Sequence, residues 1–161
     1  MSDPRAGARL GIDVGSVRIG VAVCDPSAVI ATPLDVVARD ARTHRDLAAI
    51  AEHAVQRAVI EVVVGWPKSL SGKETRAAGL ARGFAEQLAA TIAPTPVRLV
   101  DERLSTVEAA RRLRGAGRDA KAARAVIDAA AAVVILESAL EVERRTGRPP
   151  GELVEVAMPA S

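Results

Sequence analysis

The sequence predicts an α/β fold in which helices pack on the faces of a mixed five-stranded sheet. Three observations support this class: apolar segments with strand periodicity open the chain, later strands alternate with helical segments, and the length of 161 residues suits one domain. A chain of that length buries about two-thirds of its unfolded surface. A meander followed by alternating helices and strands requires antiparallel and parallel pairing in one sheet.

The first part of the domain is predicted to be a hairpin and a third strand. Residues 9–14 alternate leucine, isoleucine and valine with glycine and aspartate, which is the two-residue period of a strand. A turn at 15–17 leads to a second apolar segment at 19–24, so these two strands should pair. A further short strand is expected at 34–38.

The middle of the chain is predicted to alternate helices and strands. A helix at 43–58 precedes a strand at 59–64, whose residues are β-branched apart from one glutamate, as in strands that are buried on both faces. A loop at 65–72 leads into a helix at 73–90. The fifth strand is expected at 96–100.

The last elements are two helices that act as one interrupted unit. Ser105 and Glu108 form a capping box that starts a helix through residue 114, and a final helix runs from about 119 to 145. The order β-β-β-α-β-α-β-α is that of the ribonuclease H-like fold. We expect a domain at 9–146 between a flexible N-terminus, 1–8, and a flexible C-terminal tail, 147–161.

Composition excludes several classes of protein. Apolar residues make up 49% and charged residues 26%, which is an ordinary globular balance. The N-terminus has no apolar core of a signal peptide, and the longest apolar stretch, 125–136, is shorter than the roughly 20 residues of a membrane span. Cys24 alone cannot form an internal disulfide and suits a reducing compartment. We therefore expect a soluble cytoplasmic protein that does not bind membranes.

Three acidic positions lie where apolar residues are expected. Asp13 lies in a predicted central strand, and Asp128 is the only charged residue of the apolar helical stretch 125–136. Asp101 and Glu102 follow the fifth strand, at the sheet end where ligands collect in open sheets with parallel strands. Because a buried lone carboxylate costs several kcal/mol, each of these acids needs a compensating partner.

Two interpretations of the acids compete. Each acid could be neutralised by a nearby arginine: Arg18, Arg103 or Arg124. Three carboxylates that meet at one sheet end repel one another, however, and this favours a bound cation. Oxygen ligands without histidine or cysteine indicate Mg²⁺ or Mn²⁺. Such ions activate water and stabilise a leaving oxygen in the two-metal route to phosphodiester cleavage.

Four segments together resemble one known family. They are LGIDVGSVRIGVAVC at 10–24, VVVGWPKSLSGKET at 62–75, VDERLSTVEAARRL at 100–113 and VIDAAAAVVILE at 126–137. In this order they are similar to the YqgF/RuvX family, whose members are described as pre-16S ribosomal RNA nucleases or Holliday junction resolvases. One departure is Trp66, where the family pattern leads us to expect an aliphatic residue before the proline.

The resemblance implies a metal-dependent nuclease with Asp13, Glu102 and Asp128 as catalytic residues and metal ligands. Asp13 would bridge two Mg²⁺ or Mn²⁺ ions, Glu102 would bind one, and Asp128 would bind the other and orient the attacking water. Hydrolysis would proceed without a covalent enzyme intermediate. Asp101 stays a possible substitute for Glu102, because neighbouring strand residues face opposite ways and the pattern does not fix the register.

Basic residues near these acids are candidates for phosphate binding. The loop at 65–72 could hold a phosphate at a helix N-terminus, or it could be an ordinary capped loop. The basic stretch at 111–124 could bind a nucleic-acid backbone, or it could be a solvated helix face. Trp66 could stack on a base or anchor the loop, and aromatic residues are too few for base stacking to dominate. The candidate nucleic-acid-binding residues are Arg18, Lys68, Ser69, Lys73, Arg103, Arg111, Arg112, Arg114, Arg118, Lys121 and Arg124.

The resemblance offers two substrates. We favour the 5′ end of pre-16S ribosomal RNA, processed in ribosome biogenesis, over a four-way DNA junction in recombination and repair. A junction resolvase makes two matched nicks and so requires a symmetric dimer; the four alanines at 129–132 would allow a homodimer by close helix approach. More remote functions are an ATPase or kinase of the actin-like superfamily and a non-catalytic nucleic-acid-binding module.

Overall fold

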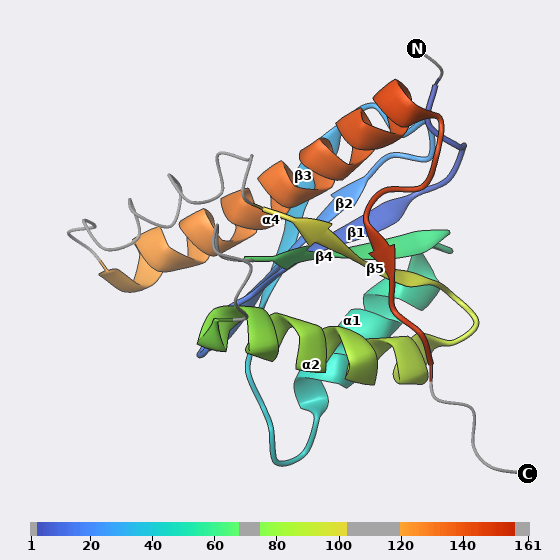
Figure 1. The fold of residues 1–161 in the computed structure, drawn as a ribbon. Helices are drawn as coiled ribbons and strands as arrows, with labels where there is room; N and C mark the ends of the chain where they lie inside the picture. The colour runs from blue at the N-terminus through green and yellow to red at the C-terminus, as the bar shows by residue number, and fades with distance from the viewer. Residues whose placement is uncertain (1–2, 68–74, 103–119, 157–161) are drawn as a thin grey trace, which may run out of the picture.

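A mixed six-stranded sheet forms the centre of the molecule, with α1 and α2 on one face and α4 on the other (Figure 1). The structure is a computed structural model that describes residues 3–67, 75–102 and 120–156, with the backbone alone at 120–128. The strand order is β3-β2-β1-β4-β5-β6. The elements are β1 (Arg9–Val14), β2 (Arg18–Cys24), β3 (Ala31–Ala38), α1 (Arg45–Gln56), β4 (Glu61–Trp66), α2 (Arg76–Ile92), β5 (Val97–Asp101), α4 (Ala120–Thr146) and β6 (Glu152–Leu153).

The pairing of the strands follows from how they are connected. β1, β2 and β3 pair antiparallel, because short turns join them, whereas β4 pairs parallel to β1 and β5 parallel to β4, each after a helix. The mixed sheet expected from the element order is therefore confirmed.

The two faces of the sheet carry separate apolar cores. Leu10 and Ile12 of β1 and Leu99 of β5 belong to the core under α1 and α2. Val63 of β4 and Val100 of β5 belong to a second core under α4. Because successive strand residues point to opposite faces, the odd positions of β1 lie on the α4 side.

Helix α4 packs very closely on β1. A Cβ added to Gly11 would lie 2.8 Å from the carbonyl oxygen of Ala132 and 2.7 Å from Cβ of Leu136. Three of the four alanines that we expected to allow a homodimer, Ala129, Ala131 and Ala132, are buried within the chain, whereas Ala130 is exposed. No helix in the described parts of the chain is long and apolar enough to cross a membrane.

Replacing Gly11 with alanine should therefore destabilise the protein by about 1–3 kcal/mol, the usual cost of overpacking a core. The free energy of unfolding in urea measures this effect. Gly79→Ala in α2 is the matched control, because a Cβ there meets no atom within 4 Å. A Gly11→Ala variant as stable as the wild type would show that α4 does not lie this close to β1.

Strand β6 was not predicted. Its two residues pair antiparallel with β5, as Arg98 with Leu153 and Leu99 with Glu152, and the N–H of Val154 donates to the carbonyl of Val97 at 2.9 Å. The expected number of five strands is therefore wrong by one, and β6 lies in the segment 147–161 that we expected to be a flexible tail. Two residues are too few to show a periodicity, so pairing with β5 alone defines this strand.

Most boundaries of the other elements differ from the prediction by a few residues. β3 begins at Ala31 instead of residue 34. Helix α2 begins at Arg76 instead of residue 73, because Thr75 is its N-cap and its side-chain oxygen accepts a hydrogen bond from the N–H of Ala78 at 3.1 Å. The helix expected at 105–114 lies outside the described residues.

Five charged side chains form a buried charge cluster at the start of β1: Arg5, Arg9, Glu61, Arg98 and Glu143. Arg9, Glu61 and Glu143 are at most 3% exposed. Glu143 of α4 accepts hydrogen bonds from Arg5 at 2.8 Å and from Arg9 at 3.0 Å, and Glu61 accepts from Arg98 at 2.7 Å and from Arg5 at 3.1 Å. The cluster thereby joins β1, β4, β5 and α4 to a residue of the N-terminal segment 1–8 that we expected to be flexible.

Candidate active site

Asp13 lies at the end of β1 and is only 2% exposed. It pairs with Gly20 across the hairpin, and as an odd position of β1 it shares the α4 face with Gly11. The turn after it is tight: the N–H of Gly15 donates to the carbonyl of Arg18 at 2.9 Å, and a Cβ at Gly15 would lie 2.6 Å from that oxygen. Glycine at this position thus lets the hairpin close directly after Asp13.

Glu102 follows β5 and is 6% exposed. Its N–H donates to the carbonyl of Trp66 at 3.2 Å, which continues the pairing of β5 with β4 by one residue. The carboxylate lies over Gly65, where an added Cβ would collide with Oε1 of Glu102 and with Cδ1 of Ile135. Because Ile135 belongs to α4, Glu102 is on the α4 face.

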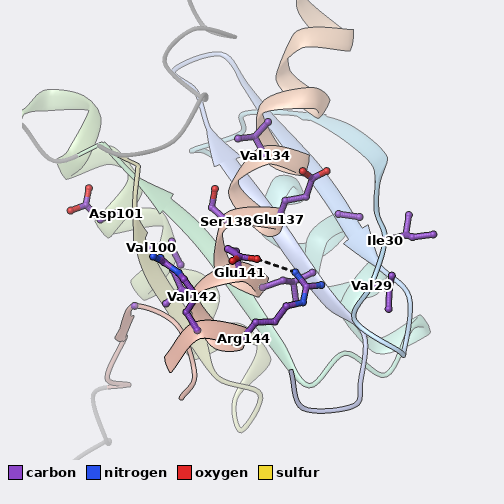
Figure 2. Close-up of a pocket in the computed structure, with 14 residues that line it drawn as sticks. Val29, Ile30, Val100, Asp101, Val134, Glu137, Ser138, Glu141, Val142 and Arg144 are labelled. Atoms are coloured by element: carbon purple, nitrogen blue, oxygen red, sulfur yellow. Dashed lines mark hydrogen bonds and ion pairs between the residues drawn. The ribbon is translucent and has the colours of Figure 1, made fainter. Parts of the chain in front are cut away.

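Asp101 and Glu102 face opposite ways, as neighbouring strand residues do. Asp101 pairs with Trp66, whose ring belongs to the core under α1 and α2, and the Asp101 side chain is exposed. Figure 2 shows its carboxylate pointing away from α4. Of these two acids, Glu102 is therefore the one that shares a face with Asp13.

Asp128 lies on α4, and only its backbone is described. The helix runs antiparallel to β1, because Arg9 at the start of β1 contacts Glu143 and Gly11 lies against Ala132. The step from Gly11 to Asp13 along β1 is about 6.6 Å. About four residues of an α-helix cover the same distance. The turn of α4 beside Asp13 is therefore the one before Ala132, and Asp128 belongs to it.

The chemistry of this donor set fits a hard divalent cation. Asp13 and Glu102 are buried carboxylates on one face, and β4 alone separates their strands. Oxygen ligands of this kind suit Mg²⁺ or Mn²⁺. Among the side chains that the structure describes, no group of three histidine, cysteine or acidic residues lies close enough to hold a metal ion. Asp128, the third predicted ligand, is not among those side chains.

Most of the predicted nucleic-acid-binding residues lie outside the described part of the chain. Arg18 is half-buried at the start of β2, on the hairpin that carries Asp13. Lys121 and Arg124 lie in the first turns of α4, where the backbone alone is described. The residues outside the described ranges are Lys68, Ser69, Lys73, Arg103, Arg111, Arg112, Arg114 and Arg118.

Trp66 is an anchor on the α2 side of the sheet. Its half-buried ring packs against the core under α1 and α2, and the guanidinium of Arg82 lies 4.5 Å from the ring centroid. Arg82 also pairs with Glu152 of β6 at 3.3 Å. Of the two roles considered for Trp66, that of a packed anchor is the one that these contacts fit.

A cavity of about 930 Å³ lies next to α4 and was not predicted from the sequence. Val29 and Ile30, which are exposed, line one side of it, and Val100 and Asp101 line another (Figure 2). Glu141 and Arg144, which also line it, form an ion pair of 3.4 Å (Figure 2). Asp13 and Glu102 are not among the lining residues, so this cavity and the candidate active site are different places.

Comparison with known proteins identifies the family. The family model described as "RuvX: Holliday junction resolvase" matches residues 7–142. The chain belongs to the RuvX family. A RuvX-family relative from Nocardioides sp., named "Putative pre-16S rRNA nuclease", is 56% identical over 155 residues, which are 94% of this chain and 98% of the relative. A relative of the same name from Streptomyces coelicolor is 53% identical over 96% of this chain and 92% of its own length.

Solved structures show the fold of this RuvX-family chain. RuvC of Thermus thermophilus in complex with a Holliday junction matches with a TM-score of 0.57 and 21% identity, over 89% of this chain and 99% of RuvC. The ribonuclease H-like fold expected from the element order is thereby confirmed. Family and fold together support nuclease activity.

Proposed function

We propose that this chain is a metal-dependent endonuclease that hydrolyses phosphodiester bonds in the cytoplasm, with Asp13, Glu102 and Asp128 as catalytic metal ligands. The observation that carries the proposal is the placement of two buried carboxylates on the α4 face, on either side of β4. Carboxylates that approach one another across a single strand repel, and a shared divalent cation offsets this repulsion.

The sheet register brings the carboxylates toward one another. Ile12 pairs with Val64, so Asp13 and Gly65 are the next residues on adjacent strands, about 4.8 Å apart. Since Glu102 lies over Gly65, its carboxylate is one strand away from Asp13. The backbone of Asp128 approaches the same place from α4.

Each residue has a distinct task in the proposed reaction. Asp13, Glu102 and Asp128 would hold one or two Mg²⁺ or Mn²⁺ ions, and Asp128 would also orient the attacking water. Bound divalent ions lower the pKa of that water and offset charge on the phosphodiester. Arg18 and the predicted basic residues hold phosphates beside the cut, so substrate binding should weaken as the salt concentration rises.

The substrate that we propose is the 5′ end of pre-16S ribosomal RNA. The support is that relatives 50–56% identical over at least 90% of this chain carry the corresponding name. The description of the family model favours a second candidate, a four-way DNA junction. That activity needs two related active sites and hence a homodimer, so solution mass with and without junction DNA bears on the choice.

Metal removal tests the proposal. Purified protein is incubated with a pre-16S leader RNA, a four-way junction and a linear duplex, each with Mg²⁺, with Mn²⁺ and with EDTA. We expect cleavage of the leader RNA with either ion, none in EDTA, and recovery when excess Mg²⁺ is added. Cleavage of the junction alone would replace the proposed substrate, and cleavage that continues in EDTA would contradict the metal-dependent mechanism.

A further inference from the structure

Because Gly65 has no side chain, the space above it is open, and the Glu102 carboxylate occupies this space. A Cβ built at Gly65 would collide with Oε1 of Glu102, would lie 3.0 Å from its Cδ, and would also collide with Cδ1 of Ile135. Strand side chains stand roughly perpendicular to the sheet. The Glu102 carboxylate therefore takes the place directly above β4 where any side chain at residue 65 would stand.

We propose that Gly65 is a positioning residue for Glu102: because residue 65 has no side chain, the Glu102 carboxylate can lie across β4 on the side of Asp13 and bind the metal ion there. The inference rests on the proposed function. Gly65 touches neither metal nor substrate in this scheme and acts only through Glu102.

Pairing with β4 holds the described backbone of β5 in place up to Glu102. The Glu102 N–H bonds to the carbonyl of Trp66, and Trp66 pairs with Asp101 in the last rung of β4 and β5. Arg82 covers the Trp66 ring and is itself paired with Glu152 on β6. A Cβ at residue 65 must therefore be accommodated by side chains alone.

The atoms in the way are the ends of flexible side chains, and this decides what Gly65→Ala does. The Glu102 carboxylate can rotate out at little cost to folding, but it then leaves the position from which it would bind metal. Changes in groups that orient metal ligands typically weaken metal binding about 10–100-fold. We expect the same range for Gly65→Ala, with a smaller loss of stability than for Gly11→Ala.

Calorimetric titration with Mn²⁺ and urea unfolding in EDTA test this on the full-length protein. We expect Gly65→Ala to bind Mn²⁺ at least ten-fold more weakly, and to lose less free energy of unfolding than Gly11→Ala, whose added Cβ meets backbone. Gly83→Ala is the matched control, because no atom lies within 4 Å of its added Cβ, and it should keep wild-type affinity. A Gly65→Ala variant that binds Mn²⁺ as the wild type does would overturn the inference.

A second variant separates positioning of Glu102 from packing against α4. Ile135→Val removes Cδ1, the only atom of Ile135 that an added Cβ would collide with. If Gly65 served packing alone, the double variant Gly65→Ala with Ile135→Val would regain Mn²⁺ affinity. We expect its affinity to stay low, and recovery to the wild-type value would overturn the inference.

A double-mutant cycle in EDTA keeps this inference distinct from the proposed function. Glu102→Ala removes the carboxylate, so Gly65→Ala should be less destabilising in that background than in the wild type. If the two changes in the free energy of unfolding were strictly additive, residue 65 and Glu102 would not be in contact. A wild-type protein that binds no Mn²⁺ would contradict the proposed function, whereas the cycle needs no metal and still decides the contact.

Discussion

Replacing Asp13 with asparagine is expected to abolish metal-dependent cleavage while substrate binding persists. Asparagine keeps the shape of the buried side chain but removes the charge that would hold the cation. A metal ion contributes several kcal/mol to the transition state, and about 4 kcal/mol corresponds to 10³-fold in rate. Cleavage by Asp13→Asn should therefore fall about 10³-fold or more, with an unchanged Kd for the substrate measured in EDTA.

Asp101→Asn is the matched control for this experiment. Asp101 adjoins Glu102 in sequence, but its side chain is exposed and its carboxylate points away from α4 (Figure 2). We expect this variant to cleave at close to the wild-type rate, whereas Glu102→Gln should behave like Asp13→Asn. If Asp13→Asn cleaved normally, the carboxylates would have no catalytic role, and a protein that binds without ever cleaving would be a non-catalytic module.

Loss of Glu143 should strongly destabilise the protein. Its carboxylate accepts hydrogen bonds from Arg5 and Arg9, and Arg9 is 1% exposed. Removing one partner of a buried ion pair leaves an uncompensated charge and costs about 3–5 kcal/mol. Urea unfolding of Glu143→Ala measures this cost. Glu141→Ala is the control from the same helix, since Glu141 is exposed and its ion pair with Arg144 spans 3.4 Å at the surface.

The Glu143 carboxylate should also make the free energy of unfolding depend on pH in the acidic range. Burial acts to raise the pKa of Glu143, but hydrogen bonds and charge from Arg5 and Arg9 outweigh burial and lower the pKa from its usual value of 4.5. A group with a lowered folded-state pKa stabilises the protein above its unfolded-state pKa, and this stabilisation is lost as the pH falls through the folded-state value. The stability difference between wild type and Glu143→Gln should therefore be constant above about pH 5 and shrink below pH 4.5. A difference independent of pH would contradict the ion pairing.

The acids could be predicted because their signal is local. Asp13 and Asp128 each interrupt an apolar pattern within one element, and desolvation makes such an interruption costly wherever the element lies. The register that separates Asp101 from Glu102 is not local. It depends on the pairing of Gly65 with Val100, and therefore on how two distant strands align.

The buried charge cluster and β6 escaped prediction for a related reason. Glu61 stands out in its strand, but its partner Arg98 is 37 residues away, and Arg9 and Glu143 are separated by 134 residues. No periodicity links positions that far apart. The sheet and its helices, in contrast, follow from patterns within ten to twenty residues.

The cluster at the far end of α4 has a mechanical consequence for catalysis. Glu143 is tied to the first residue of β1, and Asp128 lies fifteen residues earlier on the same continuous helix, about 22 Å away. The ion pair of Glu143 with Arg9 therefore fixes where α4 lies along β1, and with it the position of Asp128, the proposed active-site acid. Inserting a single residue between the two would turn one end by about 100° relative to the other, so the proposed role of Asp128 requires this spacing.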